Sequence, residues 1–242
     1  VDDIVYSDNP YGCIDANYFV PDWPVGRLPD EKGNDTGLLM QQLRRIIKEH
    51  QAMAKTQKTS PGTMAFPFEM LLSFFQQLFQ LNKKQEVGET IGYTASIWKR
   101  ASIGAYRPIG ASNMIAVSPP ITSENVDTVA LRDAELAYYN LHGIIDGGEW
   151  FGQKSFNDTS WEGSDFPIAL QPSDLTTRGK NQQIVLSEAC YGGYVVDKEI
   201  EDSLALKFLS LDAKGMVGST AIAYGSIQPP LIGADLLANY FW

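Results

Sequence analysis

Two segments, residues 134–143 (AELAYYNLHG) and residues 183–193 (QIVLSEACYGG), decide the fold class that the sequence predicts. Each segment begins with apolar, β-prone residues and then presents a reactive side chain, His142 in the first and Cys190 in the second, with glycine following. In a parallel sheet, residues of this kind lie at the carboxyl ends of strands, where open α/β folds hold their active sites. The pattern therefore predicts two strands of a parallel sheet whose ends carry His142 and Cys190.

Strand and helix patterns alternate along the chain, which predicts an α/β fold with a mainly parallel sheet. Strands are expected at residues 21–29 (at a sheet edge), 89–96, 113–117, 134–141, 183–186 and 215–224, the last one buried. Helices are expected at residues 35–55, 68–81, 124–132, 197–211 and 231–242, with a loop or broken helix at 97–110. The long loop at 144–181 is expected to form a wall of the active-site cleft, because loops of this length are usually functional.

Composition narrows the class of protein. A chain of 242 residues is long enough for one large domain with a substantial core. A net charge of −10 argues against nucleic acid and anionic membranes as partners, and an acidic cleft would attract basic substrates. No run of about 18 apolar residues is present, so no membrane insertion is expected. The chain begins at Val1 without methionine and shows no targeting signal, so we expect it to be part of a larger protein.

Cys190 and His142 are the candidate catalytic pair, because a thiol nucleophile needs a base within hydrogen-bonding reach. The chain has only two cysteines and two histidines. His50 falls on the apolar face of the helix at 35–55, which indicates packing, and Cys13 lies in a turn-rich segment. The amide groups of Gly143 and Cys190 are the candidates for an oxyanion hole. The alternative is a buried cysteine and a core histidine that never meet.

Glu188 precedes Cys190 by two residues, and alternate side chains of a strand share a face. If the strand continues to Cys190, the Glu188 carboxylate points the same way as the thiol. It could then bind a lysine or arginine side chain at P1, the substrate residue before the cleaved bond. The alternative is that Glu188 pairs with a structural cation.

These segments resemble a clan of cysteine peptidases that comprises caspases, legumains, metacaspases and gingipains. His142 precedes Cys190 by 48 residues, close to the interval of about 50 residues in caspases. The His-Gly and Glu-Ala-Cys-x-Gly-Gly motifs also occur in the same order as in this clan. Within the clan, residues 25–29 (VGRLP), 149–152 (EWFG) and 215–223 (GMVGSTAIA) resemble gingipain-type peptidases of family C25. The similarity extends over most of the chain in the correct order.

The resemblance implies a caspase-like three-layer α/β/α sandwich with endopeptidase or self-processing activity on proteins or peptides. It implies one catalytic domain over 1–242, with an N-terminal strand and helix portion at 1–66 and a catalytic core at 67–242. An acid at the place of Glu188 lines the S1 pocket in legumains and metacaspases, and Trp150 and Tyr191 are the further residues expected to contact substrate. The resemblance also suggests a secreted or cell-surface protein. No cofactor or active-site metal is expected; structural calcium is implied, but residues 2–17 and 157–165 match no calcium loop.

Two departures from gingipains keep alternatives open. Residues 95–100 (ASIWKR) contain no carboxylate to orient His142, which favours a Cys-His dyad or a backbone carbonyl as the orienting group. The turn at 225–230 lacks the tryptophan of the gingipain S1 pocket, so strict arginine specificity does not follow. One alternative function is a catalytically silent caspase-like surface or scaffold domain. A hydrolase or transferase with Cys190 on a nucleophile elbow ranks last, because the histidine of that fold follows the nucleophile. The sequence does not determine the oligomeric state.

Overall fold

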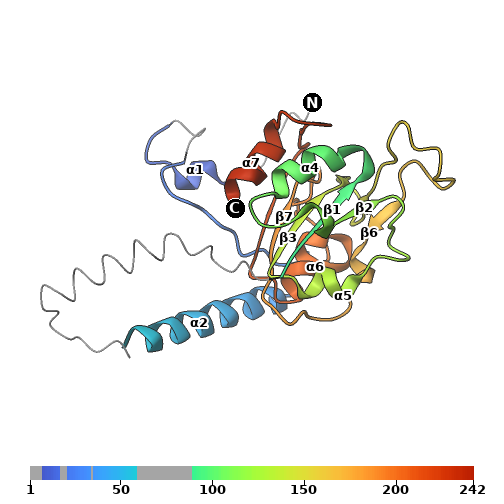
Figure 1. Cartoon of the computed structure of the whole chain (residues 1–242). Coiled ribbons are helices and arrows are strands. Elements are labelled where there is room, and N and C mark those ends of the chain that lie inside the picture. The colour runs from blue at the N-terminus through green and yellow to red at the C-terminus, as the bar shows by residue number, and fades with distance from the viewer. Residues whose placement is uncertain (1–6, 17–20, 34, 59–88) are drawn as a thin grey trace, which may run out of the picture.

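The computed structural model describes residues 7–16, 21–33, 35–58 and 89–242, so the helix expected at 68–81 lies outside the described residues. Its centre is a five-stranded, all-parallel sheet with the strand order β2-β1-β3-β7-β8 (Figure 1). The strands are β1 (Thr90–Ala95), β2 (Ile115–Ser118), β3 (Leu136–Asn140), β7 (Ile184–Ser187) and β8 (Gly215–Gly218). Helices cover both faces, and the predicted three-layer α/β/α sandwich is therefore confirmed.

Helices α4 (Lys99–Tyr106) and α7 (Gly233–Phe241) lie side by side over one face of the sheet (Figure 1). The opposite side carries α2 (Gly37–Lys58), α5 (Thr128–Asp133) and α6 (Leu204–Ser210). Shorter elements are helix α1 (Asn9–Gly12) and the 3₁₀ turns at Ser96–Trp98, Ser112–Met114, Pro172–Asp174 and Ile200–Asp202. A small antiparallel sheet, β4 (His142–Gly143), β5 (Trp150–Phe151) and β6 (Ile168–Leu170), forms within and beside the long loop.

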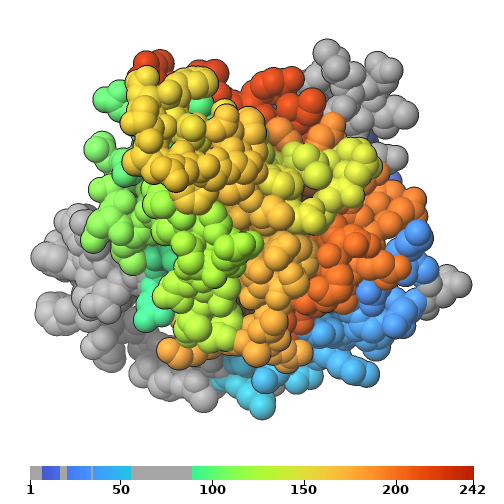
Figure 2. Space-filling view, turned by 90° about the vertical axis from the view of Figure 1, so that its right-hand side faces the viewer, coloured from blue at the N-terminus to red at the C-terminus, as the bar shows by residue number. Residues whose placement is uncertain are grey.

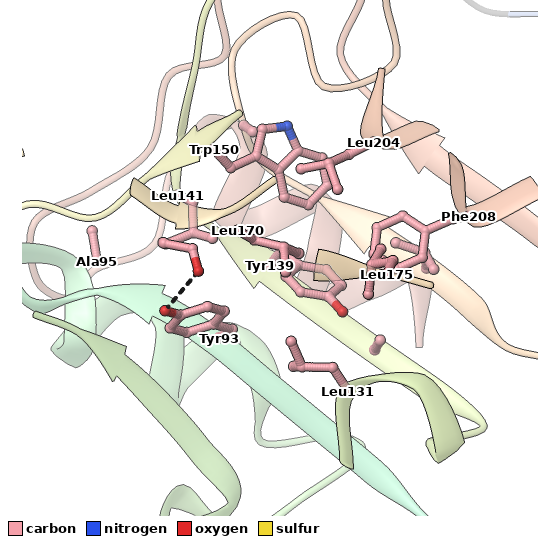
Figure 3. Close-up of a cluster of buried hydrophobic side chains, with 14 of the residues drawn as sticks. Tyr93, Ala95, Leu131, Tyr139, Leu141, Trp150, Leu170, Leu175, Leu204 and Phe208 are labelled. Carbon is pink, nitrogen blue, oxygen red and sulfur yellow. Dashed lines mark hydrogen bonds between the residues drawn. The ribbon is translucent and has the colours of Figure 1, made fainter. Parts of the chain in front are cut away.

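The two faces of the central sheet bury different cores, because successive side chains of a strand point to opposite sides. Tyr139 of β3 joins Tyr93, Trp150 and Phe208 in the larger core on the α5 and α6 side (Figure 3). The adjacent Tyr138 points to the other face, where α4 and α7 cover the smaller core. A strand that is buried on both faces has apolar residues at nearly every position. This explains the apolar run that precedes His142.

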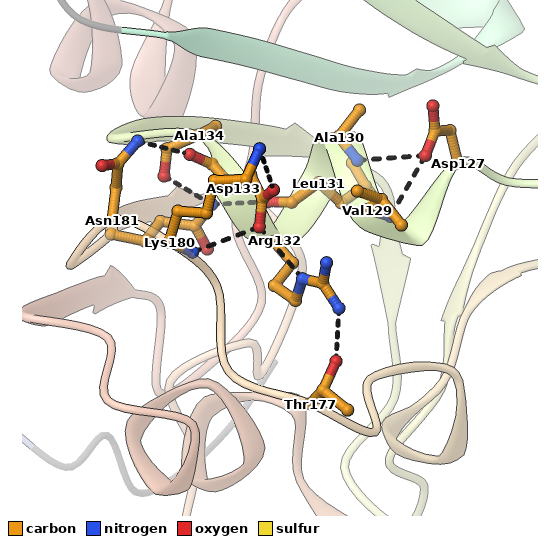
Figure 4. A network of polar contacts seen from close by, with 11 residues as sticks. Asp127, Val129, Ala130, Leu131, Arg132, Asp133, Ala134, Thr177, Lys180 and Asn181 are labelled. Atoms are coloured by element: carbon orange, nitrogen blue, oxygen red, sulfur yellow. Dashed lines mark hydrogen bonds and ion pairs between the residues drawn. The ribbon is translucent and has the colours of Figure 1, made fainter.

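A polar network joins the amino ends of β3 and β7 (Figure 4). The buried Asp133 carboxylate, at the end of α5, pairs with Arg132 and Lys180 and accepts the Lys180 backbone N–H at 3.2 Å. Asn181 donates to the Asp133 carbonyl oxygen at 2.7 Å. The chain that leads into β7 is therefore attached to the corner that leads into β3.

The packed face of α2 differs from the prediction. Leu38 and Gln42 are buried, whereas Ile47, His50 and Met53, which were expected on the packed face, are exposed. The Gln42 side chain donates to the Pro29 carbonyl oxygen at 2.6 Å, so its burial leaves no unpaired amide N–H. Polar side chains with backbone partners can replace apolar ones on a packed face, which hydrophobic periodicity cannot detect.

Three other expected elements are corrected. Residues 21–29 form no strand. The strand expected over 215–224 ends at Gly218 and lies half-exposed at the sheet edge, because the chain turns at Ser219, whose hydroxyl accepts the Ala221 N–H at 3.2 Å. The helix expected at 197–211 divides into a 3₁₀ turn and α6, and Ser203 caps the start of α6.

Candidate functional site

The His142 and Cys190 segments follow neighbouring strands. Strands β3 and β7 pair in parallel, with Tyr139 opposite Ser187, and both motifs emerge at their carboxyl ends. A Cβ atom added to Gly143 would overlap the carbonyl oxygen of Cys190, so only glycine permits the two backbones to approach this closely. The structure therefore brings together, at one edge of the sheet, the two motifs that the sequence singled out.

His142 lies on β4, and its orientation is determined by neighbours from three segments. Its Nε2 atom lies 2.8 Å from the amide oxygen of Gln153. Because an amide oxygen only accepts hydrogen bonds, Nε2 carries the proton and Nδ1 is left as the basic nitrogen. The Trp98 ring packs against the imidazole at a centroid distance of 4.3 Å, and the Phe166 ring lies edge-on at 5.4 Å.

The surroundings of His142 favour its neutral form. Partial burial lowers the pKa of His142 below its ordinary value of 6.5, and the hydrogen bond that its Nε2–H donates to Gln153 opposes this shift. A histidine whose pKa is depressed in this way is uncharged at neutral pH. It can therefore accept a proton from a thiol, as a general base must.

Cys190 begins a sharp turn after β7. The turn includes Tyr191, whose φ of 56° lies in the left-handed region, and the Gly192 N–H donates to the Ala189 carbonyl oxygen at 3.0 Å. The Cys190 thiol lies 3.6 Å from the Ala223 carbonyl oxygen and is hydrogen-bonded there rather than to His142. Within the described ranges, the backbone N–H of Cys190 donates to no protein group, so it is available to a bound oxyanion.

Glu188 lines a cavity whose lining includes neither Cys190 nor His142. The strand ends at Ser187, so the extension to Cys190 that would align Glu188 with the thiol is not present. Glu188 nevertheless lines a cavity of about 350 Å³ together with Ala223, the residue that accepts the thiol hydrogen bond. The remaining walls are mainly apolar and include Leu186, Val217, Tyr224 and Leu237.

The Glu188 carboxyl group is buried, with 7% of the residue exposed, and accepts the Tyr138 hydroxyl at 2.8 Å. Burial, followed by the nearby Asp235 carboxylate, raises its pKa well above the ordinary value of 4.5. No cation among the described residues forms an ion pair with Glu188. The alternative of a structural cation partner is therefore not observed in this part of the chain.

Trp150 does not have the expected role in substrate binding. It is 3% exposed, and its ring packs against Tyr139 at 5.2 Å and Phe208 at 6.2 Å in the larger core (Figure 3). The apolar ring is buried because β5 folds back over the sheet next to β4. Tyr191, by contrast, is half-buried directly beside Cys190 and packs edge-on against Tyr194.

Sequence reasoning missed Gln153, Trp98, Phe166 and Asp235. Residues 95–100 contain no carboxylate, and the residue of this segment that contacts His142 is the aromatic Trp98. Gln153 directly follows the EWFG segment, and this position beside a motif was the signal in the sequence. In the structure, β5 of that segment pairs with β4, which carries His142. Asp235 had no local signal, because its contact with Glu188 depends on where α7 packs.

A second cavity, of about 520 Å³, lies between α2 and the edge strand β8. Arg45, Glu49 and Met216 are among its lining residues, and none of the site residues predicted from the sequence lines it. The smaller cavity, which Glu188 lines, is therefore the candidate binding site, despite its size. Figure 2 shows that residues of the long loop, in yellow, form much of one face of the molecule.

In the described part of the chain, no three His, Cys, Asp or Glu side chains gather in a way that could hold a metal ion. Some of the calcium candidates among residues 2–17 lie outside the described ranges. No helix of the described residues is both long and apolar enough to span a membrane. Comparisons of the chain with protein-family models, curated proteins and solved structures found no match.

Proposed function

We propose that the protein is a cysteine endopeptidase in which Cys190 is the nucleophile and His142 is the general base. The observation that carries this proposal is the close approach of Gly143 to the Cys190 carbonyl oxygen, since it joins the two motif segments at the carboxyl ends of β3 and β7. Protein or peptide chains are the proposed substrates. The proposal requires the thiol to leave the Ala223 carbonyl oxygen for the imidazole, and catalytic hydrogen bonds of this kind often tighten only when substrate binds.

The reaction follows from the protonation states of the site. His142 Nδ1 takes the thiol proton, and the Cys190 thiolate attacks the substrate carbonyl carbon. The backbone N–H of Cys190 donates to the oxyanion that forms, and the amide of Gly143 is the second candidate donor. The imidazolium then protonates the leaving amine, and water hydrolyses the thioester with His142 again as the base.

Gln153 takes the orienting role for which the sequence offered no carboxylate. Its amide oxygen holds the Nε2 proton of His142 at 2.8 Å and so directs Nδ1 away from Gln153. Because the partner is neutral, it orients the ring without stabilising the imidazolium as a carboxylate would. The site is therefore a Cys-His dyad with an amide as its orienting group.

Specificity for a basic P1 residue is part of the proposal. Lysine and arginine side chains combine an aliphatic stem with a charged end. The cavity has the complementary character, with apolar walls and the Glu188 carboxyl group in its lining. Membership of the gingipain-like family, and with it secretion or display on a cell surface, is proposed from the sequence motifs alone.

A catalytically silent scaffold domain is the second candidate. The observation that favours it is the thiol hydrogen bond to Ala223 instead of His142, together with the Trp98 ring packed on the imidazole. A silent domain needs no reactive thiol, whereas a peptidase does. Reactivity of Cys190 therefore separates the two functions.

The test combines labelling with turnover. Iodoacetamide labelling is compared between wild type, Cys190→Ala and Cys13→Ala, the last being a matched control because Cys13 is the only other cysteine. Hydrolysis of a fluorogenic peptide panel varied at P1 is measured for these proteins and for His142→Ala. We expect turnover that survives Cys13→Ala and falls by about 10³-fold or more in Cys190→Ala. Absence of wild-type turnover together with an unreactive Cys190 would establish the scaffold instead.

A further inference from the structure

Strand β8 is an edge of the central sheet and lacks the features that usually protect such an edge. Its sequence at 215–218 is Gly-Met-Val-Gly, without a charged residue or a proline, and all four residues are half-buried. The other edge strand, β2, is followed by Pro119 and Pro120, and its last carbonyl group, that of Ser118, accepts the Gln153 N–H at 3.2 Å. An unprotected edge is a template for the addition of a further strand.

The ladder between β7 and β8 shows which backbone groups of β8 face outward. Successive residues of a strand direct their N–H and C=O groups to opposite neighbours. The Ile184 N–H donates to the Glu135 carbonyl oxygen, just before β3, so the next residue, Val185, faces β8. Met216 lies opposite Val185, and in a parallel pair the residue opposite a bonded one faces away. The N–H and C=O groups of Met216 therefore point to the open edge.

The open edge of β8 borders the cavity of about 520 Å³, which we call the β8 groove. One wall of the groove is α2, the other is residues 25–29, and α6 contributes Ala205 and Leu209. Residues 25–29 form no backbone hydrogen bond with β8 in the part of the chain that the structure describes. The Met216 side chain packs against the larger core, on the α6 side of the sheet. The groove thus exposes both an apolar surface and an unpaired strand edge.

Two polar atoms of α2 in the groove are buried without a hydrogen-bond partner among the described residues. They are Arg45 Nε and Glu49 Oε1, which lie 3.9 Å apart. The Arg45 side chain is 10% exposed, and its terminal nitrogens donate to the carbonyl oxygens of Ala213 and Lys214, just before β8. Buried polar groups are nearly always hydrogen-bonded, so these atoms indicate a ligand that supplies one acceptor and one donor. A peptide group carries one of each.

The charges around the β8 groove largely cancel. Arg45 forms an ion pair with Glu49, and Arg27 forms one with Asp8. The remaining charged residue of the lining, Lys214, is exposed. A groove of this kind gives little advantage to a charged ligand, whereas its unsatisfied groups are the donors and acceptors that a peptide backbone needs. The ligand that fits these groups is an uncharged peptide in the extended conformation.

We propose that the β8 groove binds an extended, uncharged segment of a partner protein, which adds a strand to the central sheet beside Met216. Every second side chain of an added strand lies on the α6 side, so the segment has apolar residues at alternate positions. Because β8 has four residues, the pairing extends over about 13 Å. In this mode of recognition, main-chain hydrogen bonds give affinity and the contacts of alternate side chains give specificity.

A partner segment fits the groove better than a second copy of the chain. The two walls recess the edge of β8, so a single extended strand can reach it. The edge of a second folded copy lies between the same two walls, which would meet before the strands could pair. The inference goes beyond the proposed function and does not rest on it, because neither Cys190 nor His142 lines the β8 groove.

The test uses the peptide acetyl-SVTVS-amide as the probe, since it is uncharged and alternates apolar and polar side chains. Its binding is measured by titration calorimetry to the full chain carrying Cys190→Ala, so that the result does not depend on peptidase activity. Two further peptides are N-methylated, one at both valines and the other at the threonine and the last serine. Because only every second N–H of an added strand faces β8, only one of the two modifications removes hydrogen bonds to the sheet.

We expect the unmodified peptide to bind, and one N-methylated peptide to bind at least about tenfold more weakly than the other, since two hydrogen bonds are lost. No binding of the unmodified peptide, or equal binding of the two N-methylated peptides, would overturn the proposal. This comparison needs no substitution in the groove, so it stands even if a variant fails to fold.

Met216→Pro tests the position of the added strand. Proline removes the outward N–H of Met216 and leaves the ladder with β7 in place, as prolines on edge strands do. Met216→Val is the matched control, because it also shortens the side chain but keeps the N–H. We expect Met216→Pro to bind the peptide at least about tenfold more weakly than Met216→Val.

Equal affinity of Met216→Pro and Met216→Val would show that the peptide does not pair with β8. Sedimentation of the peptide-free chain tests the other occupant of the groove. A dimer that Met216→Pro dissociates and Met216→Val does not would identify a second copy as the partner and overturn the proposal. A monomer in all three proteins, with binding that follows the two comparisons above, is the expected result.

Discussion

Two buried carboxyl sites lie at opposite ends of the paired strands β3 and β7, and their partners differ. At the amino ends, Asp133 is paired with Arg132 and Lys180 and accepts a backbone N–H (Figure 4). At the carboxyl ends, Glu188 and Asp235 are both buried next to a cavity and accept hydrogen bonds from neutral donors, and neither forms an ion pair with a described residue. A buried charge is stabilised by a partner, or it changes its protonation state.

The difference indicates different roles. Burial raises the pKa of Asp133, but the hydrogen bonds and charges of Arg132 and Lys180 outweigh it and hold the pKa below its ordinary value. That site therefore attaches one chain segment to another. The pKa of Glu188 is instead raised by burial and by Asp235, which leaves the site open to an external cation. Two changes of the same type, carboxylate to amide, should consequently have opposite effects at the two sites.

The largest expected effect is on specificity. Glu188→Gln should lower kcat/KM for substrates with lysine or arginine at P1 by about 100-fold, because a buried ionic contact is worth about 2–5 kcal/mol. The measurement compares these substrates with one that has glutamine at P1. Asp133→Asn is the matched control and should leave the ratio of the two rates unchanged. An equal loss on basic and neutral substrates would show that Glu188 does not contact the P1 side chain.

A third carboxyl site can be built next to His142. Gln153→Glu places a carboxylate at Nε2, which should raise the pKa of His142 and move the acid limb of kcat/KM upward by about 1–2 pH units. In wild type, burial lowers this pKa, so the acid limb should lie below 6.5. Gln153→Ala should leave the acid limb of kcat/KM at low pH, as in wild type. It should reduce kcat by about 10–100-fold, because the imidazole ring is no longer held in one orientation.

Gln182→Glu serves as the control for these profiles, because Gln182 is exposed and the change adds the same charge. If Gln153→Glu left the acid limb in place, the 2.8 Å contact would not control the imidazole during catalysis.

Asp133→Asn should lower the thermal unfolding temperature by several degrees, because Arg132 and Lys180 lose their anionic partner. Thermal unfolding monitored by circular dichroism measures this effect. Glu124→Gln, a change at an exposed acid, is the control and should leave the unfolding temperature nearly unchanged. An unaltered unfolding temperature for Asp133→Asn would mean that the network in Figure 4 does not stabilise the fold.

The smallest effect is a pH dependence of stability at the unpartnered site. Folded Glu188 keeps its proton above pH 4.5, where the unfolded chain releases it, so this group lowers stability as the pH rises. Glu188→Gln removes the group. As the pH rises from about 4.5 to neutrality, the unfolding temperature of the variant should therefore increase relative to that of wild type. The expected change is roughly 2–4 °C, which corresponds to 1 kcal/mol. A constant difference across that range would contradict a protonated Glu188.

Much of the layout was predictable because its signals are local. The apolar runs before His142 and Cys190 are strands in the structure, and the glycine after His142 marks a close backbone approach. Periodicity failed where polar residues pack through backbone partners, as at Gln42 of α2. It also failed for Trp150, since an aromatic residue near a motif has the same local pattern whether it faces the core or a ligand.

The sequence by itself determined the order of the strands in the central sheet along the chain, the parallel α/β class and the identity of the two reactive segments, because these depend on spacing along the chain. Only the tertiary structure decided that β3 and β7 are neighbours, that Gln153 orients His142 and that Asp235 from the last helix meets Glu188. Those contacts join residues that several elements separate, and their formation depends on how the helices pack on the sheet. The raised pKa of Glu188 follows from that packing, since burial and a second acid, rather than its position in the sequence, cause it.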